Sequence, residues 1–205
     1  MKTYFAMLLG AATLTLGAAS CSSKPDSVEQ AQATNNANKG MTNADTTVTT
    51  AQGVSGVQRP AFDSQFMTKA ASGGMLEVQL GQAMAKRATL PEVKQFAQEM
   101  VTDHTKNNDQ LKALAAQKNI TLPTTLGKDQ QKVYDDVLAE KGPALDQKYV
   151  QAMLADHGDD IKEYQEAIAK SGDRDIQAFA QQTLPVLQMH LGMVQKIQPV
   201  VEAKK

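Results

Sequence analysis

The chain has 205 residues, of which 41% are hydrophobic and 4% aromatic, and its formal net charge is -1 at pH 7. This length has room for one folded domain, and the composition predicts a core of aliphatic and methionine side chains. The 21 basic residues nearly balance the 22 acidic ones. Because no positive field is available to neutralise a run of phosphates, a nucleic-acid partner is set aside.

The first 21 residues have the features of an export signal. Lys2 supplies a positive start, and an apolar or small run from Tyr4 to Ala19 follows it. This run is shorter than the ~20 apolar residues that a membrane-spanning helix needs. We therefore expect residues 1–21 to be a signal peptide and the protein to be exported.

Cys21 is the only cysteine, so the chain cannot form an intramolecular disulfide. The small residues before it, Ala18-Ala19-Ser20, resemble the lipobox of bacterial lipoproteins, with alanine where leucine is usual. The resemblance implies that Cys21 carries a lipid that binds the protein to a membrane. An ordinary cleaved signal with an incidental cysteine is the alternative. Ser22 resembles the residue that lets such lipoproteins reach the outer membrane, so we expect an outer-membrane or periplasmic location.

Residues 22–61 contain no aromatic residue and are rich in Ser, Thr, Asn, Gln, Ala and Gly. A segment of this composition cannot bury enough apolar surface to offset its conformational entropy. We expect a disordered linker without a recognition role, which separates the lipid from the folded part by roughly 35 Å.

Beyond this linker, apolar residues recur at the spacings of three and four that are typical of amphipathic helices. Asp63 is the expected cap of a first helix that ends near Arg87. The sequence Thr89-Leu90-Pro91-Glu92 has the form of a capping box with proline in the first turn. It predicts a second helix that runs to about Lys118.

The second half of the chain predicts another pair of helices. Residues 119–142 are too many for a tight hairpin and hold one short helical piece around 130–140, so they read as a crossover. Pro143 begins the third helix, Gly172 ends it, and Asp173 caps the fourth. Two hairpins joined by a crossover predict an all-α, ferritin-like four-helix bundle over residues 62–198, with a tail at 199–205.

The sequence Met100-Val101-Thr102-Asp103-His104 returns in altered form as Met153-Leu154-Ala155-Asp156-His157. The third and last histidine, His190, lies in the apolar stripe of the fourth helix, and Glu77 lies in that of the first. We expect Glu77, His104, His157 and His190 to converge near the middle of the bundle, because moving any of them to solvent would expose its whole stripe.

Burying four polar groups costs free energy unless they satisfy one another, water or a metal ion. One carboxylate and three imidazoles would suit a transition metal such as Zn, Fe or Cu as cofactor. The alternative is that they are hydrogen-bonded core residues. Asp103 and Asp156 are expected either to support the histidines from behind or to form inter-helix ion pairs, with solvated surface carboxylates as the alternative. Pro185 should kink the fourth helix near this layer.

Several segments resemble the bacterial domain-of-unknown-function family 4142, exported proteins with a predicted ferritin-like fold. They are Phe66 to Glu77, the two Asp-His pairs, and Leu184-Pro185-Val186-Leu187 with His190. The resemblance covers about residues 62–197 and implies fold and export but no reaction. The glutamate three residues before histidine in di-iron bundles is replaced here by Val101, Leu154 and Leu187, which argues against oxygen-activating chemistry.

The leading hypothesis from sequence is a lipid-anchored envelope protein with a non-enzymatic binding or structural role, by loose analogy in stress tolerance. A metal-binding or metal-dependent redox protein is the alternative. No nucleophile with an adjacent base and no glycine-rich phosphate loop points to another reaction. The sequence identifies no protein partner and leaves assembly into a homo-oligomer open.

Overall fold

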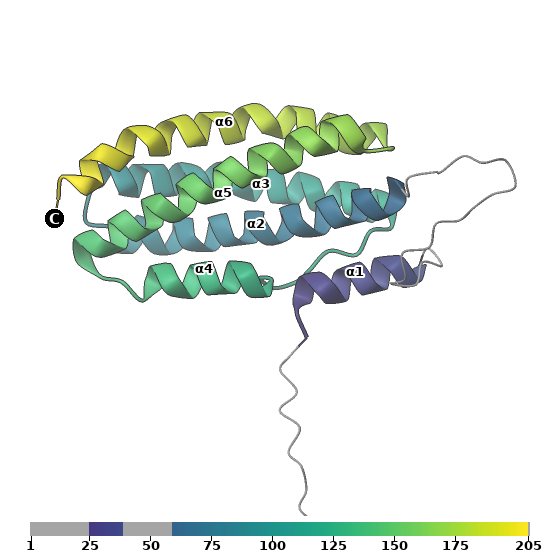
Figure 1. The fold of residues 1–205 in the computed structure, drawn as a ribbon, viewed down its shortest axis with the longest axis horizontal. Helices are drawn as coiled ribbons and strands as arrows, with labels where there is room; N and C mark the ends of the chain where they lie inside the picture. The colour runs from purple at the N-terminus through teal and green to yellow at the C-terminus, as the bar shows by residue number, and fades with distance from the viewer. Residues whose placement is uncertain (1–24, 39–58, 205) are drawn as a thin grey trace, which may run out of the picture.

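A computed structural model of the protein describes residues 25–38 and 59–204 (Figure 1). Within these ranges the chain forms helices and connecting loops and contains no strand, which confirms the predicted all-α class. The signal peptide at 1–21 and its Cys21 lie outside the described residues. The helices are α1 (Ser27–Asn38), α2 (Arg59–Arg87), α3 (Pro91–Lys118), α4 (Lys128–Leu138), α5 (Gly142–Lys170) and α6 (Arg174–Glu202).

Four long helices form the bundle, as two hairpins lying side by side (Figure 1). α2 packs mainly on α3 and α5 mainly on α6, while α2 also contacts α5 and α3 also contacts α6. The expected crossover between the second and third long helices is present and holds the expected short helix, α4. It lies along the outside of α2 and α5.

The prediction of a disordered linker over 22–61 is wrong for residues 27–38, which form α1 and lie against the bundle. Asn35 is buried, and its side chain both donates to the Thr121 carbonyl oxygen and accepts from the Thr121 N–H, at 2.9 and 2.7 Å. Asp26 caps the first turn of α1 and accepts a third hydrogen bond from the Lys128 N–H of α4. α1 has little apolar surface, and polar contacts with the crossover hold it against the bundle instead. Linker residues 39–58 are outside the described part.

Two predicted helix starts are corrected. α2 begins at Arg59, so Asp63 lies buried inside the helix and does not cap it. Thr89 does not cap α3 either: its N–H and hydroxyl both donate to Asp146 of α5, and the Leu90 N–H donates to the same carboxylate. The Asp146 carboxylate, from the other hairpin, therefore accepts the backbone N–H groups at the start of α3. The local sequence does not reveal this partner.

The predicted end of the fourth helix is corrected as well. α6 continues to Glu202 and passes through Pro185 and Pro199, so most of the expected tail is helical. Val201 is buried in the core and accounts for the extra turn. The kink expected at Pro185 stays a prediction.

The core consists of two apolar clusters separated by a polar layer. One holds Leu80, Phe96, Met100, Met153 and Val194, and the other holds Ala70, Leu111, Tyr164 and Leu187. On α3, α5 and α6 the single histidine lies between residues of the first cluster and residues of the second. The layer therefore crosses the middle of the bundle with apolar packing on both sides.

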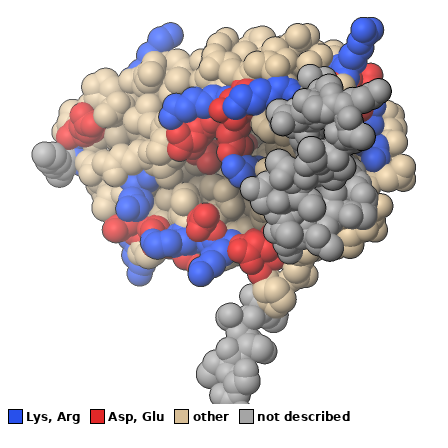
Figure 2. Space-filling model, turned by 45° about the vertical axis from the view of Figure 1, so that its right-hand side comes forward, with Lys and Arg blue, Asp and Glu red and all other residues tan. Residues whose placement is uncertain are grey.

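On the face drawn in Figure 2, acidic and basic side chains lie close to one another over the bundle. Neither sign covers a broad area there, as the balanced composition would suggest. Among the described helices, none combines the length and the apolar character needed to cross a membrane.

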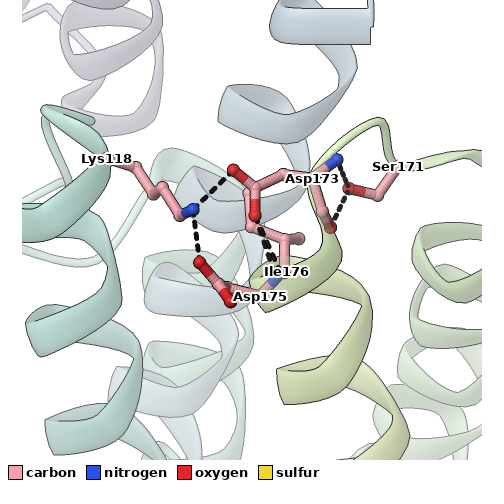
Figure 3. A network of polar contacts seen from close by, with 5 residues as sticks. All are labelled: Lys118, Ser171, Asp173, Asp175 and Ile176. Atoms are coloured by element: carbon pink, nitrogen blue, oxygen red, sulfur yellow. Dashed lines mark hydrogen bonds and ion pairs between the residues drawn. The ribbon is translucent and has the colours of Figure 1, made fainter.

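A charged cluster joins the two hairpins at the end of the bundle near the α5–α6 turn (Figure 3). The Lys118 ammonium of α3 lies 2.7 Å from Asp173 and 2.6 Å from Asp175. Asp173 also caps α6 as predicted, because its Oδ1 accepts from the Asp175 and Ile176 N–H groups. Desolvation would raise the pKa of Asp173, but the hydrogen bonds from Lys118 and from these two N–H groups outweigh it and hold the pKa below its usual value.

We predict that Asp173→Ala lowers the free energy of unfolding by about 1–2 kcal/mol at pH 7, because it removes a helix cap and an ion pair together. Asp175→Ala is the matched control: it removes only an exposed ion pair and should cost below about 0.5 kcal/mol. A carboxylate with a lowered folded-state pKa stabilises above its unfolded pKa and loses this effect as the pH falls through the folded value. Urea unfolding at pH 7 and pH 3 tests this, and an Asp173→Ala cost that stays constant on acidification would contradict it.

Candidate metal centre

The structure brings Glu77, His104, His157 and His190 together from four different helices. All four are buried, with side-chain exposures between 0 and 3%. The imidazole centroids lie 5.1 to 5.7 Å apart, and one ring nitrogen from each histidine lies within 4.8 Å of those from the other two. The helical pattern that placed each residue on an inward face therefore also places all four at the same height.

Three of these residues form a chain of short polar contacts that ends at Asp103. Glu77 Oε2 lies 2.6 Å from His104 Nδ1, and His104 Nε2 lies 3.1 Å from His190 Nδ1. His190 Nε2 then donates to Asp103 Oδ2 at 2.9 Å, since a carboxylate oxygen can only accept. Asp103 is 29% exposed, so the chain leads from the centre to the surface between α3 and α6.

The environment decides where the protons of this chain reside. Burial lowers the pKa of His104 to about 4. The pKa of His190 is also lowered, mainly by burial and secondly by the neighbouring His104. Burial raises the pKa of Glu77 well above its usual value. Protonated Glu77 then donates to His104 Nδ1, and His104 Nε2–H donates to His190. If Glu77 gives up its proton, His104 can hold its hydrogen on Nδ1 instead. Nε2 of His104 and Nδ1 of His190 then both present lone pairs.

His157 differs from the other two imidazoles because its inward nitrogen has no partner. Nδ1 donates to the Met153 carbonyl oxygen at 3.0 Å, which fixes the tautomer, and burial lowers the pKa of the ring to about 3. Nε2 therefore carries a lone pair. It lies 3.5 Å from Glu77 Oε1, and neither atom has a hydrogen-bonding partner among the described residues. Two buried acceptors that face each other cost roughly 1–3 kcal/mol each unless a proton or a cation lies between them.

Asp156 adds a second carboxyl group to this side of the layer. One oxygen of Asp156, one of Glu77 and a nitrogen of His157 lie within 4.8 Å of one another. Burial first, and the charge of Glu77 second, raise the pKa of Asp156 well above its usual value. Asp160, one turn along α5, has its pKa raised in the same way by burial and by Asp156. Glu77, Asp156 and Asp160 thus form an acidic cluster beside the imidazoles, on the side of α2 and α5.

The structure places Asp103 and Asp156 differently from one another. Asp103 contacts the histidine of α6, not the one next to it in sequence, whereas Asp156 contacts the carboxyl of Glu77. Sequence reasoning missed Asp160 and the Met153 carbonyl. The position of Asp160, three residues after His157 and four after Asp156, is the signal that could have revealed it.

Two glycines, one turn before Glu77 on α2, lie next to polar side chains of α3 and α5. A Cβ at Gly74 would lie 2.0 Å from Asn108 Oδ1, so a side chain there would displace the end of the Asn108 side chain. At Gly73 a Cβ would lie 3.8 Å from Asp160 Oδ1, which is ordinary contact. Of the two adjacent glycines, Gly74 is therefore the one that allows a close approach.

The family described as "Domain of unknown function (DUF4142)" matches residues 46–197. Among solved structures, the chain is similar to the crystal structure of a DUF305 fragment from Deinococcus radiodurans, with a TM-score of 0.60 and 9% sequence identity. That likeness covers 67% of this chain and 95% of the other. At this identity it shows the fold alone. No curated protein matches the chain.

We predict that Asp156→Asn stabilises the metal-free protein at pH 7 to 8. A carboxyl group whose folded pKa is raised stabilises below its unfolded pKa, near 4, and this contribution is lost as the pH rises through the folded value. Asparagine removes the titration, so the gain should grow with pH and exceed about 1 kcal/mol, the equivalent of one pKa unit. Thermal melts in chelator from pH 4 to 8 measure it. Asp109→Asn, at a side chain that is 69% exposed, is the control that should show no such trend.

Proposed function

Since the chain belongs to the DUF4142 family, whose description assigns no activity, we propose from the site itself that the bundle binds a divalent transition-metal ion. The ligands would be His104, His157 and His190, with Glu77 beside them. The observation that carries this proposal is the unpartnered Nε2 of His157, which is fully buried and faces an unpartnered oxygen of Glu77. A cation at this point satisfies both atoms, whereas a proton placed there would leave two acceptors facing each other elsewhere along Glu77, His104, His190 and Asp103.

The donor set selects the class of metal. Neutral imidazole is the commonest protein ligand for Zn, Cu, Fe and Ni, while Mg and Ca prefer sites built from oxygen. Burial lowers the pKa of all three rings and so favours the neutral form, which is the form able to ligate. Zn²⁺ in a three-histidine site retains a fourth position for water or substrate.

The atoms behind the imidazoles also fit metal binding. The Met153 carbonyl holds Nδ1–H of His157, and Asp103 holds Nε2–H of His190. Glu77 can accept from Nδ1–H of His104 once it is ionised. Each ring thus has a partner that orients it and fixes its tautomer, as is usual behind ligating histidines. We propose binding and not a reaction, because the described residues around the layer offer no activated nucleophile.

We predict that the chelator-treated full-length protein binds one Co²⁺ per chain, with visible absorption bands typical of a nitrogen-rich site. Zn²⁺ should displace Co²⁺, whereas a large excess of Mg²⁺ should not. His157→Leu should weaken binding at least about tenfold, since it removes the one ligand that has no other role. Optical titration with competing Zn²⁺ is the measurement.

Tyr149→Phe provides the matched control. The Tyr149 hydroxyl is buried and has no hydrogen-bonding partner in the described part of the chain. Its loss should leave Co²⁺ binding unchanged. A wild-type protein that shows no Co²⁺ bands and no metal by elemental analysis would leave hydrogen-bonded core histidines as the correct interpretation.

We also propose that the protein is exported and held at the membrane by a lipid on Cys21. The support is the lipobox-like sequence and the position of α1, which begins six residues after Cys21. Six residues span at most about 21 Å, so this arrangement would hold the bundle close to the bilayer surface and not at the end of a 40-residue tether.

For the anchor we predict that Cys21→Ala abolishes labelling by a fatty-acid analogue and moves the protein from the membrane pellet to the soluble fraction. Ser22→Ala retains the cysteine and should keep both properties. Cell fractionation after a carbonate wash measures the second effect. A Cys21→Ala protein that still sediments with membranes would refute lipidation at this residue.

A further inference from the structure

We infer that the metal ion reaches the three histidines through a groove between α4 and α5, and that Glu77, Asp156 and His157 form the first position it occupies. This inference rests on the proposed function and adds to it a second cation position and a route. The groove has a volume of about 360 Å³. The residues that line it and matter here are Asp136, Val137, Ala152, Ala155, Asp156 and Asp159.

Asp156 is the residue that connects the groove with the centre. It lines the groove, and one of its oxygens lies within 4.8 Å of ligand atoms of Glu77 and His157. Oδ2 of Asp156, Oε1 of Glu77 and Nε2 of His157 are all buried and have no hydrogen-bonding partner among the described residues. Two carboxyl oxygens and one imidazole nitrogen around one point make a position for a cation, with two oxygen donors where the histidine triad has none.

The two positions cannot both be filled through His157. Its Nδ1 is bound to the Met153 carbonyl, so only Nε2 can ligate, and this nitrogen belongs to both groups. The positions are therefore occupied in succession. Since the acidic one lies against the groove and the imidazole one beyond it, the order is groove, carboxylates, then histidines.

The lining of the groove holds three acidic side chains and one basic one, and this balance favours a cation. Asp136 lies 2.5 Å from Lys132, and Asp159 lies 2.7 Å from Lys162, so both carboxylates at the mouth are paired. Lys148 also lines the groove. Of the three carboxyls that line the groove, Asp156 is the one without an ion pair to a described lysine, and one of its oxygens lies within 4.8 Å of ligand atoms of Glu77 and His157.

On the opposite side of the layer, the described carboxylates near His190 are Asp103 and Glu99, and Asp103 Oδ2 already accepts from His190 Nε2. An ion that entered there would have to break the contact that orients one of its own ligands. On the α4–α5 side the ion would displace the proton that bonds Asp156 to Glu77, while the contacts that orient His157 and His190 would stay in place.

The test measures the rate of Co²⁺ uptake by the chelator-treated full-length protein, by stopped-flow absorption at low ionic strength. Ala155 is exposed on the groove wall and takes no part in ligation. Ala155→Lys should slow association at least about threefold, and Ala155→Glu should accelerate it by a similar factor, because charge at an entrance changes cation capture. Both effects should shrink in 0.5 M salt, because screening by the dissolved ions limits the reach of a charge to a few ångströms. The final Co²⁺ spectrum should be the same in all variants.

Two further variants keep the outcome clear. Ala113→Lys introduces the same charge at an exposed position of α3 and should leave the rate unchanged. Ala155→Gln fills the groove without charge, and slower uptake by this variant as well would show that the passage is used. Equal rates in wild type and in all Ala155 variants would overturn the route while leaving the metal site intact. A wild-type protein without any Co²⁺ spectrum would instead overturn the proposed function, before any rates are compared.

Discussion

The 3.5 Å approach of His157 Nε2 to Glu77 Oε1 is the contact on which the character of this bundle depends. Two acceptors face each other in an interior with apolar clusters above and below, and this costs free energy in the isolated chain. Apolar residues at the same positions would join the two clusters into one continuous core. A cation between the two atoms turns the same geometry into a favourable one, which gives the polar layer a physical reason to exist.

The contacts around that pair determine how the layer can respond to a cation. Protonated Glu77 closes a complete hydrogen-bond chain through His104 and His190 to Asp103. Ionised Glu77 reverses the tautomer of His104 and frees two ring nitrogens. In the first arrangement Glu77, His104 and His190 satisfy one another while Nε2 of His157 has no partner; in the second, one nitrogen of each ring carries a lone pair without a partner. A bound divalent ion would take the place of the proton that Glu77 gives up.

Helical spacing was sufficient to predict the fold and the residues of the centre. The apolar stripes gave four long helices, the crossover and the inward position of Glu77 and all three histidines. The helix ends were less predictable, because Asp146 of α5 caps α3 across the bundle and Asn35 holds α1 through the backbone of Thr121. Such caps depend on tertiary contacts. The apolar pattern of α1 is too weak to predict that it packs on the bundle.

The partners of the site residues were also beyond reach of the sequence, for a related reason. Spacing along one helix fixes the side on which a residue lies, but not which neighbouring helix it meets. Asp103 and Asp156 precede histidine in the same way, yet the first meets His190 on α6 and the second meets Glu77 on α2. A main-chain partner such as the Met153 carbonyl has no signature in residue type at all.

This difference between the two Asp-His pairs makes the two sides of the polar layer chemically different. Where Asp103 meets an imidazole, acid and base satisfy each other and the carboxylate serves to orient a ligand. Where Asp156 meets a carboxyl, two groups of the same kind are pressed together, and burial and repulsion raise the pKa of Asp156. The same sequence element thus produces one side where a carboxylate orients a ring and one side where two carboxyl groups meet. The groove between α4 and α5 lies on the side of Asp156, so the acidic side of the layer is also the side on which the groove lies.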